Sequence, residues 1–356
     1  MTQREVTTES PAPSSSVSSK TGSGTITHQK QSAAARPEPT LQRKAAIARG
    51  AALDHRGEVL VAPIPNFDLN RTIFNTLEGR MPRFVMRTRI AKEPHWNEKA
   101  AHQIDAAYAK ANPAAVLPKI DPTLLRFLIE ECDFDVEHAD GSFLDHLYFG
   151  FEYTALHYPD RSPLVMLLHS ILGTGTNTFA MPKEKIPALE ALLSEFDWRH
   201  VEAFPSVLRV LYDLPLRKEL RENLSRLDSL KSIRIHRVID NAPITLSAED
   251  FFVQLNYQLI HLIDFLPVAN WPVHSNDTSF ILFRDLYDLM ERAGKRVAKI
   301  EYTPASGRGS LRREPPSLGG LFTALIPNGL SEKMAARSVR TFSQRIGHSM
   351  DYQLVW

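Results

Sequence analysis

The pattern of apolar and polar positions along this chain predicts a protein built mainly from α-helices. Between residues 58 and 300 the apolar residues recur mostly at the three- and four-residue spacing of amphipathic helices. Only residues 233–240 alternate like a β-strand, and residues 244–246 are a candidate partner for that strand. We therefore expect a mainly α domain with little β structure over residues 58–300. Residues 301–356 are expected to form a C-terminal extension that packs on or flanks this core.

A helical hairpin is the clearest local prediction. Capping residues and apolar spacing indicate one helix over residues 143–157 and a second over residues 163–172. The connection between them, residues 158–161, is so short that the two helices must pack antiparallel. His146, near the start of the first helix, is then expected level with His169, near the end of the second.

Six more helices are expected: near residues 96–110, from residue 122 onward, and near residues 184–196, 199–212, 216–230 and 248–266. The last of these is apolar around most of its circumference, which is typical of a helix in the protein interior. Its polar residues gather in one stripe, formed by Gln254, Gln258, His261 and Asp264. This stripe either lines a site or faces water, and His261 can also pair with Asp264 one turn away.

The order of the histidine motifs resembles that of the HD-domain superfamily of metalloproteins. His146, the Leu168-His169 pair and the segment Leu-Ile-His-Leu-Ile-Asp at residues 259–264 follow each other as the superfamily's motifs do. A closer likeness is to an HD-like family of unknown function, whose motifs match His138, Asp145-His146, Leu168-His169-Ser170 and Gly173-Thr174.

This resemblance implies an HD-like helical bundle that holds one divalent metal ion, which would be iron, manganese or zinc. The implied ligands are His146, His169 and Asp264, with His138 as a fourth. Two imidazoles and a carboxylate with open positions suit zinc as a Lewis acid or ferrous iron as an oxygen-binding centre. The candidate residues lining the pocket around the metal are Tyr153, Ser170, Thr174, Gln258 and His261.

Ser170 is where the chain departs from the HD pattern. Active HD phosphohydrolases have Asp at this position, and a serine hydroxyl is a poor replacement for a carboxylate toward a hard cation. The resemblance implies a metal-dependent enzyme acting on a small polar molecule, with hydrolysis slightly ahead of iron-dependent oxygenation. The alternative is a non-catalytic HD-like scaffold that binds a ligand or a protein.

Composition and charge exclude several classes of binding partner and of site. The chain has 42 basic and 41 acidic side chains, so its net charge of +1 provides no field to attract nucleic acid or an anionic membrane. The single cysteine, Cys132, excludes an intrachain disulfide framework and a cysteine-rich zinc site. No apolar run approaches the roughly 20 residues that a membrane-spanning helix needs. No oligomeric state is indicated.

Residues 1–57 differ in composition from the rest of the chain. They are rich in Ser, Pro, Thr and Ala and nearly devoid of aromatic residues, so they cannot bury enough apolar surface to offset the entropy of ordering. We expect a disordered tail and a cytoplasmic protein. The alternative is that the tail carries an organellar or export signal.

Overall fold

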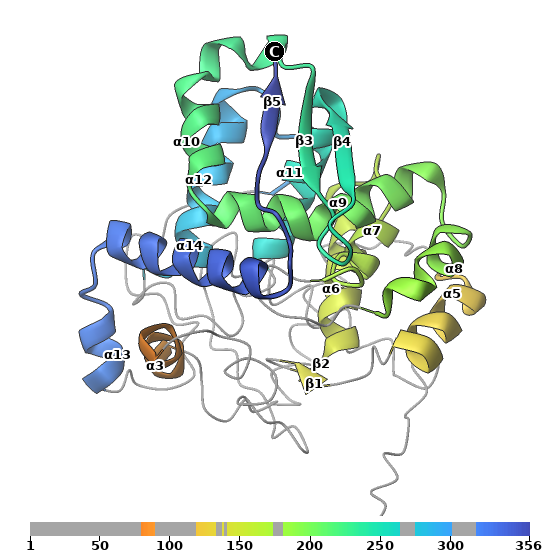
Figure 1. Cartoon of the computed structure of the whole chain (residues 1–356), viewed down its shortest axis with the longest axis horizontal. Helices are drawn as coiled ribbons and strands as arrows, with labels where there is room; N and C mark the ends of the chain where they lie inside the picture. Colours follow the sequence, from red (N-terminus) through yellow and green to blue (C-terminus); the bar gives the residue numbers. More distant parts are fainter. Residues whose placement is uncertain are drawn as a thin grey trace, which may run out of the picture. The chain divides into compact units, whose positions relative to one another are not determined.

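The structure, a computed structural model, describes residues 80–89, 119–132, 137–138, 141–173, 181–263, 275–300 and 318–356 (Figure 1). The chain divides into two units, Met1–Gln31 and Ser32–Trp356, and all described residues belong to the second. The tail predicted over residues 1–57 lies outside the described residues. The described part is mainly α, as the sequence predicts.

The helices follow one another along the chain as α3 (Arg80–Arg89), α5 (Pro122–Arg126), the π-helix η3 (Phe127–Glu131), α6 (Phe143–His157), α7 (Leu164–Leu168), the 3-10 helix η4 (Lys183–Lys185), α8 (Ile186–Glu190), α9 (Glu195–Tyr212), α10 (Pro215–Glu222), the 3-10 helix η5 (Leu224–Ser229), α11 (Ala248–Ile263), α12 (Thr278–Arg292), α13 (Leu318–Thr323) and α14 (Asn328–Arg345). The strands are β1 (Glu137–His138), β2 (Gly141–Ser142), β3 (Ser232–His236), β4 (Pro243–Ser247) and β5 (Gln353–Val355).

The predicted strand pair is confirmed as part of a three-stranded antiparallel sheet in the order β4-β3-β5, although β3 ends at His236 and residues 237–240 turn instead of continuing the strand (Figure 1). Ile233 of β3 lies opposite Leu246 of β4 and opposite Leu354 of β5. All three side chains are buried, because alternate residues of a strand point to one face. The third strand, β5, was not predicted, and it brings the last residues of the C-terminal extension into the sheet.

The predicted hairpin is also confirmed. Helix α6 has the bounds that the sequence predicts, and α7 begins at Leu164, whose N–H donates to the Ser162 hydroxyl. Regular helix ends at Leu168 rather than at residue 172, and turns continue the chain to Gly173. The two helices pack closely at Gly150, where an added Cβ would lie 2.9 Å from Met166 Cε and 3.2 Å from its Cβ.

The helix predicted over residues 184–196 is wrong as a single element. The structure divides it into η4, α8 and the beginning of α9. The new helix begins after Ser194 because this residue caps it: Ser194 Oγ accepts from the Asp197 N–H at 3.1 Å and donates to the Asp197 carboxylate at 2.6 Å. The helix predicted over residues 216–230 is likewise divided into α10 and η5.

The buried apolar side chains form two clusters. One joins α9, α11 and α12 to the sheet, and the other joins α5, η3, α7 and α8. Helices α6 and α7 contribute to both: Tyr153 and Met166 belong to the first, whereas Phe151 and Leu168 belong to the second. The hairpin that carries two of the predicted ligands is therefore held from both sides by the core.

Candidate functional site

The predicted site residues are carried by three helices that pack on one another. Helix α6 contacts α7, and α11 contacts both. Helix α11 begins at a capping box, in which Ser247 Oγ accepts from the Asp250 N–H and donates to the Asp250 carboxylate. It remains regular to Ile263, the last described residue before the gap at 264–274.

His169 lies just after α7 and is 1% exposed. Its Nδ1 lies 2.7 Å from the Met166 carbonyl oxygen. Because a carbonyl oxygen only accepts, Nδ1 carries the proton, and the lone pair of the neutral ring lies on Nε2. The chain turns away at Gly173, which has a φ of 121° and lies so close to Val238 that an added Cβ would be 2.7 Å from its Cγ1.

Three buried side chains meet at Phe204 of α9, and we call the four residues the Phe204 cluster: Phe204, His169 from the turn after α7, and Gln258 and His261 from α11. The Phe204 ring centroid lies 4.9 Å from that of His169 and 5.4 Å from that of His261. The two imidazoles are 4.7 Å apart, edge to face. Gln258 Nε2 donates to the Phe204 carbonyl oxygen at 3.1 Å. Helix α9 thus supplies the residue around which the cluster forms.

The described part of the polar stripe of α11, which is Gln254, Gln258 and His261, is buried rather than turned to water. Gln254 and Gln258 are fully buried, and His261 is 6% exposed. Within the described part of the chain, the amide oxygen of Gln258 has no hydrogen-bond partner, and neither has the amide nitrogen of Gln254. A buried polar atom without a partner costs about 1–3 kcal/mol, so such atoms often mark the place of a water, an ion or a bound group.

His200 of α9 extends the polar tract toward the start of α11. Its Nδ1 lies 3.0 Å from Gln254 Oε1, and its Nε2 lies 3.5 Å from an Asp250 carboxylate oxygen. Burial lowers the pKa of His200, against the opposing effects of Gln254 and Asp250. Nδ1 is thus hydrogen-bonded to Gln254, whereas Nε2 makes only the longer contact with Asp250 and no hydrogen bond among the described residues.

For some of the other predicted site residues, the structure describes the backbone alone or nothing. His138 lies in β1, paired with Gly141 of β2, and His146 lies in the first turn of α6. Their side chains are outside the described part of the structure, as are Asp264 and Thr174 entirely. Ser170 is buried directly after His169. Tyr153 is buried as well, and its ring stacks on His157 at 4.2 Å between centroids.

The described side chains alone do not form a metal site. Among them, no group of three His, Cys, Asp or Glu residues is arranged to hold a metal ion. Of the implied ligand set, only His169 has a described side chain, so the geometry of the complete set lies outside the described residues.

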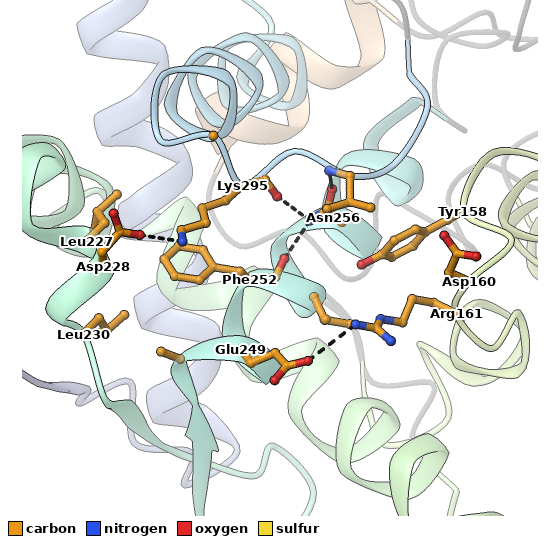
Figure 2. A pocket seen from close by; sticks show the side chains of 14 residues that line it. Tyr158, Asp160, Arg161, Leu227, Asp228, Leu230, Glu249, Phe252, Asn256 and Lys295 are labelled. Atoms are coloured by element: carbon orange, nitrogen blue, oxygen red, sulfur yellow. Dashed lines mark hydrogen bonds and ion pairs between the residues drawn. The ribbon is translucent and has the colours of Figure 1, made fainter.

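A surface pocket lies on the opposite face of α11 and has a volume of about 410 Å³ (Figure 2). Its α11 wall contains Glu249, Phe252 and Asn256, about half a turn around the helix from Gln254 and Gln258. The other walls come from the turn between α6 and α7, from η5 and from the segment after α12. None of the pocket-lining residues predicted from the sequence lines this pocket.

A buried chain of polar groups near the C-terminus was not predicted. Arg209 of α9 donates to Ser343 Oγ at 3.0 Å, and His348 Nδ1 lies 3.4 Å from the same hydroxyl. His348 Nε2 donates to the carbonyl oxygen of His236 at 2.9 Å. The signal in the sequence is the arginine inside the apolar run Val207-Leu208-Arg209-Val210-Leu211, since a lone cation in such a run is either solvated or specifically bound.

Comparison of the chain with protein-family models, with curated proteins and with solved structures finds no match. In the part of the chain that the structure describes, no helix has both the length and the apolar character needed to cross a membrane.

Proposed function

We propose that this chain is a metal-dependent enzyme of the HD-like class that acts on a small polar molecule. His146, His169 and Asp264 would hold one divalent metal ion, which is iron, manganese or zinc, with His138 nearby. The proposal combines the order of the sequence motifs with the arrangement of α6, α7 and α11, the three helices that carry or lead directly to the three ligands.

The register of the α6–α7 hairpin supports this ligand set. Gly150 of α6 lies against Met166 of α7. Because the two helices are antiparallel, the residue one turn before Gly150 lies beside the residues about one turn after Met166. The position of His146 therefore falls beside residues 169 and 170. Asp264 directly follows the last described residue of α11, three positions after His261.

The observation that carries the proposal is the state of the His169 ring. A metal-bound histidine usually donates its other ring N–H to a carbonyl or a carboxylate, which fixes the tautomer and orients the ring. His169 makes this bond to Met166, and its ring is held between Phe204 and His261. The amide oxygen of Gln258 in the same cluster, which has no partner among the described residues, is a suitable acceptor for a water or a substrate hydroxyl.

Some of the chain's residues would bind the metal ion, and others would orient the substrate. A metal ion bound by two imidazoles and one carboxylate supplies Lewis-acid or oxygen-binding chemistry. Phe204 excludes bulk water, and Gln258 orients a donor group of the substrate. Where HD phosphohydrolases have a metal-binding carboxylate, this chain has the hydroxyl of Ser170. The loss of that carboxylate favours a site for one metal ion over a site for two. Hydrolysis stays slightly ahead of oxygenation because it is the more frequent chemistry of the superfamily.

Metal content measured on matched variants tests the proposal. Protein expressed in metal-supplemented medium should contain close to one equivalent of iron, manganese or zinc, and His169→Ala should lose it. His200→Gln is the matched control, because it removes another buried histidine of the same core and should keep the metal. Circular dichroism establishes that both variants are folded. Absence of metal from the native protein, even after titration with all three ions, would reject the enzyme proposal.

The second candidate function is a non-catalytic HD-like scaffold, and Ser170 is the residue that favours it. Ser170→Asp distinguishes the two. In a one-metal site the added carboxylate should tighten manganese binding, because an anionic oxygen ligand offsets the charge of the ion. In a scaffold without a metal, Ser170→Asp should leave manganese binding absent and destabilise the protein, since it introduces a charge at a buried position.

A further inference from the structure

The pocket on the outer face of α11 has a cation at each end, an aromatic ring beside one of them, and three carboxylates in its lining, those of Asp160, Asp228 and Glu249 (Figure 2). Lys295 lies at one end with its Nζ 5.4 Å from the centroid of the Phe252 ring. Arg161 lies at the other end, in the turn between α6 and α7. Phe252 and the aliphatic side chains of Leu227, Leu230 and Val253 make the surface between them largely apolar.

The wall that carries Lys295 is fixed in place by Asn256. The two N–H groups of the Asn256 amide donate to the carbonyl oxygens of Phe252 and Lys295 at 2.8 and 3.0 Å. Its oxygen accepts from the N–H groups of Val297 and Ala298, both at 2.9 Å. All hydrogen-bonding positions of this buried amide are used, so the pocket wall is ordered before any ligand arrives.

Each cation is paired with a carboxylate that is much more exposed than itself. Lys295 Nζ lies 2.6 Å from Asp228, with side-chain exposures of 31% and 87%. Arg161 lies 3.6 Å from Glu249, with exposures of 35% and 82%. Exposed ion pairs contribute little to stability, so a ligand can replace both carboxylates at low cost. The cations, in contrast, remain part of the pocket wall.

A second donor lies beside Arg161. Tyr158 is 2% exposed, and Figure 2 shows its hydroxyl directed toward the middle of the pocket. Burial raises the pKa of Tyr158, an effect that Arg161 only partly opposes, so the phenol keeps its proton at neutral pH and can donate. A guanidinium next to a hydroxyl donor is suited to a carboxylate, because charge-assisted hydrogen bonds to such a group are strong.

We propose that this pocket binds a small organic dicarboxylate, with one carboxylate on Arg161 and Tyr158, the other on Lys295, and an apolar spacer along Phe252. The ligand replaces Glu249 and Asp228 as the counter-ion of the two cations. This site is separate from the proposed metal site, since it uses the opposite face of α11, and neither proposal depends on the other.

Calorimetric titration of the full chain with linear dicarboxylates from succinate to suberate tests the proposal. We expect one binding site with a clear optimum of chain length, and weaker binding of the monocarboxylate of the same length. Arg161→Gln and Lys295→Gln should each weaken binding by about 10-fold or more, the usual effect of losing one charge-assisted contact. Lys218→Gln removes an exposed cation of α10 that does not line the pocket, and it should change nothing.

The acidic residues give the sharpest contrast. Removal of a competing counter-ion should tighten the binding of a dianion, so Glu249→Gln and Asp228→Asn should raise affinity several-fold. If the pocket instead binds a cation or a diamine, the same two substitutions should weaken the binding of that ligand. Binding of 1,5-diaminopentane in place of dicarboxylates, equal binding by Arg161→Gln and the native protein, or no dicarboxylate binding at millimolar concentration would each overturn the proposal.

Discussion

Two buried histidines outside the Phe204 cluster lie in surroundings that disfavour their charged form. Burial lowers the pKa of His348 from its ordinary 6.5 to about 4, and the Arg209 cation acts in the same direction. The hydrogen bonds agree with a neutral ring: Nε2–H donates to the His236 carbonyl, and Nδ1 accepts from Ser343. Ser343 Oγ in turn accepts from Arg209, which orients its hydroxyl. The pKa of His200 is lowered for the same main reason.

Stability should therefore fall in mildly acidic solution. His348 takes up a proton near pH 6.5 in the unfolded chain and only near pH 4 in the folded one, so unfolding binds a proton between these values. The contribution of His348 to the free energy of unfolding is complete above pH 6.5. It is lost as the pH falls toward 4, by at most about 1.4 kcal/mol per pH unit. His348→Gln keeps a donor for the His236 carbonyl but cannot titrate. Urea unfolding from pH 7.5 to 4.5 should give a shallower pH dependence for the variant, and equal slopes would contradict this role.

Single residues also mark the limit of what the sequence can predict. The stripe of Gln254, Gln258 and His261 was identified because its members repeat a local spacing that a helix turns into a face, whereas His169 was identified from the order of the histidine motifs. The bond between Arg209 and Ser343 joins residues 134 positions apart, and no local pattern encodes such a pair. The pocket between Arg161 and Lys295 escaped prediction for the same reason, since its two cations come from distant turns.

Among the elements, those with strong local signals were predicted correctly. Helices α6 and α11 and the strand pair β3–β4 have clear periodicity and, for the helices, clear capping residues. For the segment 184–230, the sequence predicted too few separate helices. Its apolar spacing continues across Ala191–Ser194 and Asn223. The elements are nevertheless separate, because Ser194 caps the start of a new helix, α9, and because the chain changes from α10 to the 3-10 helix η5 at Asn223. The three-residue strand β5 is too short to show any period and depends on its pairing with β3.

The close approach of α6 and α7 gives a prediction at the scale of elements. Gly150→Ala places a Cβ 2.9 Å from Met166 Cε, the flexible end of that side chain, which must move, and 3.2 Å from Met166 Cβ, which requires a shift of a few tenths of an ångström. The substitution also gains about 1 kcal/mol of helix propensity. The two effects should nearly cancel. Gly150→Val adds two further carbons in the same space and should lower the free energy of unfolding by about 1–3 kcal/mol. Urea titrations of both variants measure the difference. Equal stability of the native protein and Gly150→Val would show that the helices are not in close contact here.

The same variants bear on the proposed metal site. Gly150 lies one turn from His146 on α6, so separation of the helices should move His146 away from His169. Gly150→Val should therefore lose metal affinity even where it remains folded, whereas Gly150→Ala should keep it. Retention of full metal affinity by a folded Gly150→Val protein would place the metal ligands elsewhere.

At the scale of the whole molecule, the C-terminal residues complete the core. Leu354 of β5 belongs to the larger apolar cluster, and the N–H of Lys231 donates to the Val355 carbonyl at 2.8 Å. The Arg226 guanidinium lies 4.6 Å from the centroid of the Trp356 ring, and Tyr352 donates to Glu219. The fold of the helices around β3 therefore depends on a segment more than a hundred positions away from it.

Two deletions should separate the parts of the chain that stabilise the fold from those that do not. Removal of residues 352–356 exposes Ile233 and removes the burial of Leu354, a loss of roughly 1.5–3 kcal/mol for that side chain alone, and it leaves one edge of β3 without its partner. The melting temperature should fall by several degrees. Removal of residues 1–31, which form a separate unit and have the composition of a disordered tail, should change it by no more than about a degree. Differential scanning calorimetry of the two deletions beside the full chain makes the comparison. A large loss of stability on removal of residues 1–31 would mean that this tail packs on the core, and the separation of the chain into tail and helical domain would have to be abandoned.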